Sequence, residues 1–151
     1  PKKVGILLEK GAIHWDVGDT KEAQESFNTA YMLAGPKFPD LAAYAAAGSI
    51  VAGDQAAADA LLERAYGTTM VDSDILAVAY YRAKNWPRLI ALWKTRAEMP
   101  NAPVETWFSL AAAYYTAGDN PNALATLRQA VLLYPEAEPS AAAAIKQIEG
   151  Q

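Results

Sequence analysis

The stretch WFSLAAAYYTAGDNPNALATLRQAVLLYP, residues 107–135, carries large and small side chains at fixed offsets. Large residues stand at Trp107, Leu110, Tyr114 and Leu127, and small ones at Ala111, Ala123 and Ala130. Two helices that pack antiparallel need such a pattern, because small side chains let two backbones approach closely while large ones fill the remaining space. We therefore expect a helix on each side of the turn at Gly118-Asp119.

This pattern resembles the tetratricopeptide repeat, a unit of 34 residues built from two helices. The unit has large residues at positions 4, 7, 11 and 24, small ones at positions 8, 20 and 27, and proline at position 32. With Val104 as position 1, all eight sites hold an acceptable residue, the last being Pro135. The resemblance implies an all-α fold, a right-handed α-α solenoid that binds proteins, but it does not identify the partner.

Three earlier segments fit the same frame, so the sequence predicts about four helix pairs in one domain spanning residues 1–151. Gly18-Asp19 and Gly53-Asp54 repeat the turn, and Lys84-Asn85 takes its place in the third unit. The predicted units are about 4–37, 39–72, 70–103 and 104–137, followed by a capping helix at 139–149. The predicted helices are 3–16, 20–34, 39–52, 55–66, 72–83, 86–98, 104–117, 120–133 and 139–149.

The second unit matches least well, since Ala42, Ala45 and Ser49 stand where large residues are expected. This predicts a smaller core there. The turns are 35, 31 and 34 residues apart, which predicts a shortened connection around residues 66–72. The start at Pro1, without an initiator methionine, indicates a fragment of a longer protein.

Composition excludes several functional classes. The formal net charge is −4, so the broad basic surface of a nucleic-acid-binding protein is absent. No apolar run approaches the roughly 20 residues that span a bilayer, so we expect no membrane partner for this segment. The chain has no cysteine, which removes disulfides and thiolate metal sites but leaves both a cytoplasmic and a periplasmic location in a bacterium open.

Nothing in the sequence predicts an enzyme. His14, the single histidine, occupies unit position 11, where Tyr80 and Tyr114 stand in other units, so we interpret it as a packed structural ring. There is no glycine-rich phosphate loop and no histidine-rich metal spacing. We therefore predict no catalytic residue, no metal ligand and no cofactor.

The resemblance places the binding surface on the first helix of each pair, mostly at unit positions 2, 5, 9, 12 and 13. Large aromatic rings beside small alanines are the usual anchor points for an extended peptide or an amphipathic helix. The candidate binding residues are Trp15, Tyr44, Asp74, Tyr81, Arg82, Glu105, Phe108 and Tyr115. A competing interpretation also fits the sequence: the rings pack against the first helix of the neighbouring unit and contact no ligand.

We therefore predict a protein-interaction scaffold that holds a peptide or an amphipathic helix in an apolar and aromatic concave groove. Two alternatives remain open at this point. The chain is the soluble structural tail of a bacterial envelope polysaccharide polymerase or ligase or of a similar assembly, or it is a self-association module that forms a homo-oligomer.

Overall fold

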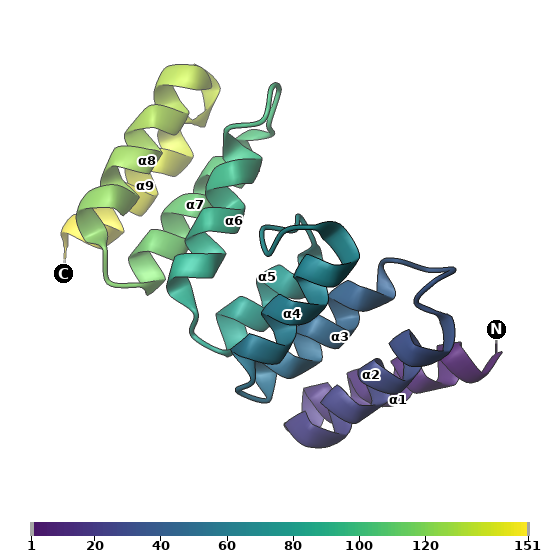
Figure 1. Cartoon of the computed structure of the whole chain (residues 1–151). Coiled ribbons are helices and arrows are strands. Elements are labelled where there is room, and N and C mark those ends of the chain that lie inside the picture. Colours follow the sequence, from purple (N-terminus) through teal and green to yellow (C-terminus); the bar gives the residue numbers. More distant parts are fainter. Residues whose placement is uncertain (1, 151) are drawn as a thin grey trace. The chain divides into compact units, whose positions relative to one another are not determined.

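The computed structural model describes residues 2–150, and all regular secondary structure in that range is helical (Figure 1). The elements are α1 (Lys2–Val17), α2 (Thr20–Ala34), α3 (Leu41–Val51), α4 (Gln55–Tyr66), α5 (Asp74–Arg82), α6 (Trp86–Ala97), α7 (Val104–Thr116), α8 (Asn120–Leu133), a 3₁₀ turn η1 (Pro135–Ala137) and α9 (Glu138–Glu149). The predicted all-α class is confirmed. The predicted bounds of α2, α4 and α8 match the observed ones, and the other helices differ by one or two residues at one or both ends.

The helices group into two compact units, one ending at Asn85 and the next beginning at Trp86. The first contains α1 to α5, and the second contains α6 to α9. The division falls between α5 and α6, which the repeat frame assigns to one pair. The expected arrangement of four repeats within one domain stays a prediction.

The turn inside each helix pair has the same backbone geometry wherever the frame places it. Gly18, Gly53 and Gly118 have φ values of 87°, 87° and 80°, in the left-handed region that glycine adopts without steric cost. In the third turn Lys84 takes this place with φ of 54°. At each turn the following backbone N–H donates to a carbonyl five residues earlier, at 2.8–2.9 Å.

Helix α3 lies at the centre of the first unit and packs against α2, α4 and α5. Nine of its residues are buried, and Tyr44 is the exposed exception within Leu41–Ile50. Ala42, Ala45, Ala46 and Ala47 have essentially no exposed surface. Their small side chains let three helices approach one, because each backbone can come close without displacing side-chain atoms.

The predicted shortened connection around residues 66–72 is wrong. Residues 67–73 separate α4 from α5, which is no shorter than the segments 35–40 and 98–103 between other pairs. The shorter spacing of 31 residues between the second and third turns is instead due to shorter helices. Helix α4 has 12 residues against 15 in α2, and α5 has 9 against 13 in α7. Gly67, with φ of 71°, ends α4 after Tyr66, as a left-handed glycine commonly does.

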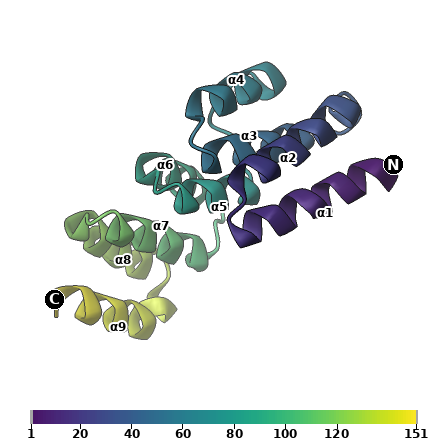
Figure 2. The ribbon, with the colours of Figure 1, turned by 90° about the horizontal axis from the view of Figure 1, so that it is seen from below.

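In the second unit, α7 packs against α6 and α8, and α9 packs against α8 (Figure 1 and Figure 2). The buried cluster formed by Ala111, Ala123, Leu127 and Ile148 joins α7, α8 and α9. The last helix is thus held by its own apolar face. In residues 2–150, no helix combines the length and the hydropathy that crossing a bilayer requires.

Two glycines of α1 provide a matched test of close helix packing. A Cβ atom on Gly11 would lie 2.5 Å from Cε1 of Phe27, a ring that is 2% exposed, whereas a Cβ atom on Gly5 meets nothing within 4 Å. Gly5→Ala should stabilise the protein by up to about 1 kcal/mol through helix propensity. Gly11→Ala should destabilise the protein by about 1–2 kcal/mol, because the clash of the new methyl group with Phe27 costs more than the gain in helix propensity contributes. Urea unfolding followed by circular dichroism measures both, and equal stabilisation by the two substitutions would show that α1 and α2 are not closely packed at Gly11.

Candidate functional site

The two units divide the predicted binding residues between them. Trp15, Tyr44, Asp74, Tyr81 and Arg82 belong to the first unit, and Glu105, Phe108 and Tyr115 belong to the second. Within each unit the structure brings some of these residues together around a cavity.

The first cavity, of about 190 Å³, lies among helices α1, α2, α3 and α5. It brings together three predicted residues, Trp15, Tyr44 and Arg82. Its other lining residues are Ala12, Asp16, Phe27, Ile75 and Val78.

Trp15 is a packed ring, with only 5% of its surface exposed. Its ring meets Phe27 edge to face at a centroid distance of 5.9 Å, and Phe27 in turn contacts Tyr44 at 5.8 Å. Such edge-to-face pairs are favourable because the positive ring edge meets the negative ring face. Trp15 therefore forms a wall of the cavity and does not project into solvent.

Arg82 joins α5 to α1 through three interactions. Its guanidinium carbon lies 5.0 Å from the centre of the Trp15 ring. Its Nη1 donates to the backbone carbonyl of Trp15 at 3.0 Å, and its Nη2 donates to Oδ1 of Asp16 at 3.3 Å. The positive charge of Arg82 is thus held by groups of the same unit.

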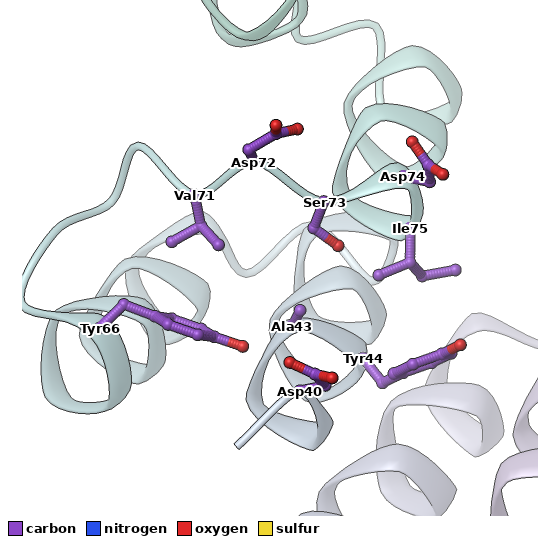
Figure 3. Close-up of a pocket in the computed structure, with 9 residues that line it drawn as sticks. All are labelled: Asp40, Ala43, Tyr44, Tyr66, Val71, Asp72, Ser73, Asp74 and Ile75. Carbon is purple, nitrogen blue, oxygen red and sulfur yellow. The ribbon is translucent and has the colours of Figure 1, made fainter. Parts of the chain in front are cut away.

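A second cavity in this unit, of about 360 Å³, contains the predicted residues Tyr44 and Asp74 (Figure 3). It lies between the start of α3, the end of α4 and the segment that leads into α5. The other lining residues are Asp40, Ala43, Tyr66, Val71, Asp72, Ser73 and Ile75.

The polar groups of this cavity do not converge on one point. The hydroxyl of Tyr66 donates to the carbonyl of Pro39 at 3.0 Å. Burial raises the pKa of Tyr66 above its usual 10.0, and the nearby carboxylate of Asp40 raises it further. The carboxylates of Asp72 and Asp74 point away from Asp40 in Figure 3. The cavity therefore lacks the converging carboxylates that a cation site needs.

The third cavity, of about 230 Å³, lies in the second unit and brings together Phe108 and Tyr115 of α7. These two rings are partly buried and pack against the cluster that contains Leu127 and Ile148. The remaining lining residues, Ala111, Ala112, Ala144 and Gln147, are mostly small or apolar. An apolar side chain from a partner could fill this space without leaving a buried polar group unpaired.

Helix α9 supplies three lining residues that the sequence analysis did not assign to the site: Ala144, Gln147 and Ile148. Ala144 and Ile148 belong to an apolar face of α9 that also includes Ala141 and Ile145, whereas no such pattern marks Gln147. The structure shows that this face covers α7 and α8.

Tyr81 and Glu105 line none of these three cavities. The side chain of Tyr81 is 57% exposed on α5, and Glu105 is exposed in the first turn of α7. Among residues 2–150 no group of three or more histidine or acidic residues is placed to hold a metal ion.

Two segments of the chain, residues 4–35 and 104–136, match a family model described as Tetratricopeptide repeat. Their starts coincide with Val4 and Val104, the first positions of the first and fourth predicted units. Neither the curated proteins nor the solved structures contain a match to this chain.

Removing the Arg82 side chain tests whether it holds α5 against α1. Arg82→Ala should lower the free energy of unfolding by about 1–2 kcal/mol, from one hydrogen bond to a carbonyl and one cation–π contact. Asp16→Asn is the matched control, because the Asp16 side chain is 73% exposed and an exposed ion pair contributes less than about 1 kcal/mol. Urea unfolding measures both variants. Equal decreases in the free energy of unfolding for the two variants would show that the contacts between Arg82 and Trp15 do not contribute to stability.

Proposed function

We propose, from the premise that this chain is a tetratricopeptide repeat protein, that it binds an amphipathic helix or apolar peptide in the cavity between α7 and α9. Repeats of this family generally mediate protein–protein interactions. One observation supports the position of the site: Phe108 and Tyr115, two rings on one face of α7, line an apolar cavity with Ile148 of α9.

The chemistry of the cavity favours an aliphatic or aromatic anchor on the partner. Seven of its eight lining residues carry apolar or aromatic side chains, and Gln147 is the eighth. A volume of about 230 Å³ is large enough for one bulky side chain and too small for a folded element. Burying such a side chain contributes roughly 25 cal/mol per Å² of apolar surface.

The rest of the partner would lie along the exposed surface next to the cavity. Ala112 is exposed on α7 at its rim, and Gln147 is exposed on α9. A helix or strand that passes over Ala112 can approach closely, because the alanine side chain is small. Only part of the partner is then desolvated, so we expect a Kd in the micromolar range. This corresponds to a binding free energy of about −8 kcal/mol.

The proposal is tested with peptides selected from a displayed library of 16-residue sequences on the wild-type protein. Affinities of the selected peptides are then measured by fluorescence polarisation. Ala112→Glu places a charge at the rim and leaves the rings in place, so it should weaken binding at least tenfold. Phe108→Ala with Tyr115→Ala should weaken it at least as much.

Leu132→Ala is the matched control, since Leu132 is an apolar side chain on α8 that is 76% exposed and lines none of the three cavities. It should leave the affinity unchanged. Circular dichroism shows whether each variant is folded, which matters because Phe108 also packs against the buried cluster. Selected peptides that bind Ala112→Glu as tightly as the wild type would refute the proposed site.

A further inference from the structure

Three acidic side chains lie at one end of the second unit. Glu105 lies in the first turn of α7, Glu136 lies in η1, and Glu138 opens α9; all three are exposed. The hydroxyl of Tyr134, the residue before η1, donates to the carbonyl of Ala102, two residues before α7 begins. This contact places the start of η1 near the start of α7, so the three carboxylates share the same end of the unit.

Basic residues do not balance this charge. Between residues 97 and 145 the sequence has one basic residue, Arg128, and its Nη2 lies 3.2 Å from Oε1 of Glu149. On α6, Nζ of Lys94 lies 3.9 Å from Oε1 of Glu98. In the part of the chain that the structure describes, none of the three acidic side chains forms an ion pair. This end of the second unit therefore attracts positive charge.

Glu105 shares a face of α7 with residues that line the cavity. It precedes Phe108 by three residues and Ala112 by seven, and residues at these spacings lie on one side of a helix. Ala112 is exposed at the rim of the cavity. Given the rise of a helix per residue, Glu105 lies roughly 10 Å from Ala112 along the axis of α7. A partner that runs along α7 with one side chain in the cavity therefore passes close to Glu105.

These carboxylates also have a local role. A negative charge in the first turn of a helix stabilises that helix, because it lies near the positive end of the helix dipole, and Glu105 and Glu138 both occupy such a turn. The local role does not depend on the cavity, and the carboxylates remain exposed while they fulfil it. They are therefore available to a partner that enters the cavity.

We infer, on the basis of the function proposed above, that the partner of the cavity between α7 and α9 carries a lysine or arginine where it lies over Glu105. The basic residue should stand about seven residues from the apolar anchor if the partner is a helix, or about three residues from it if the partner is extended. An acidic residue at that place would face like charges, which disfavours acidic partners. Positive charge thus defines the partner beyond its apolar anchor.

The test selects peptides from the same displayed library on the wild type, a site variant and a control variant. The site variant is Glu105→Gln, Glu136→Gln and Glu138→Gln. The control variant loses the same number of charges at exposed positions of the first unit, which are Glu9→Gln, Glu25→Gln and Glu63→Gln. Circular dichroism shows whether each variant is folded. Only peptides that lose binding to the Ala112→Glu protein are compared, since these occupy the cavity.

Peptides selected on the wild type and on the control variant should be enriched in lysine and arginine at the stated spacing, and those selected on the site variant should not. Replacing that basic residue of a selected peptide by glutamine should weaken its binding to the wild type roughly twofold to fivefold, the contribution of one exposed ion pair. The same replacement should not change binding to the site variant, because the interacting carboxylates are already absent. Fluorescence polarisation measures these affinities, and about 500 mM salt should reduce the difference.

Three results would contradict the inference. Peptides that occupy the cavity without an excess of basic residues, or that bind the site variant as tightly as the wild type, would overturn it and leave the proposed site intact. An equal enrichment in basic residues on the wild type and the site variant would overturn it too, because the three carboxylates would then play no part. Peptides that bind the Ala112→Glu protein as tightly as the wild type would refute the proposed site itself, and the positive charge of its partner with it.

Discussion

Close packing of helix backbones through small side chains is the constraint on which the structure depends. In the first unit, α3 is surrounded by α2, α4 and α5. It accommodates them because the residues at its contacts are alanine, glycine and serine. A chain of this size must bury a large fraction of its apolar surface to be stable. Alanine contributes little area by itself, so the stability must come from the large residues that it lets approach, such as Phe27, Leu62 and Leu76, all fully buried.

The same constraint leaves a cavity beside the last helix. Small residues of α7 and α9 line this cavity together with the rings of Phe108 and Tyr115 and the side chain of Ile148. Because their side chains are short, a space of about 230 Å³ remains unfilled. The rings are held in place by the buried cluster beneath them. A partner of the kind proposed would therefore enter a preformed cavity. The free-energy cost of ordering the binding site would then be smaller than for a site that forms only on binding.

Much of the fold was predictable from the sequence because local signals and the repeat frame agree. Gly-Asp turns and the periodic large and small residues gave helix ends to within two residues. The connection at residues 67–73 was mispredicted, because turn spacing cannot distinguish a shorter loop from shorter helices. The deep burial of the alanine helix α3 does not follow from the sequence either, because a lack of large residues predicts a smaller core.

The candidate site was less predictable, because it depends on contacts between distant segments. Phe108 and Tyr115 line the same cavity, but Ala144 and Ile148, which also line it, come from a helix outside the repeats. Trp15 shows the opposite difficulty. Its unit position is one that faces ligands in the family, yet the ring is buried by Phe27 and Arg82. Whether an aromatic ring is buried depends on the side chains of the helices that pack against it. The residue pattern of a single helix therefore cannot predict it.

Native-state amide hydrogen exchange is the most direct test of the central role of α3. If three helices depend on α3 for their packing, its amides should open only with global unfolding of the unit. The amides of Ala45, Ala46 and Ala47 should then exchange more slowly than any in α1 or α4. Amides of α3 that exchange as fast as those of α4, while the unit stays folded, would contradict the account.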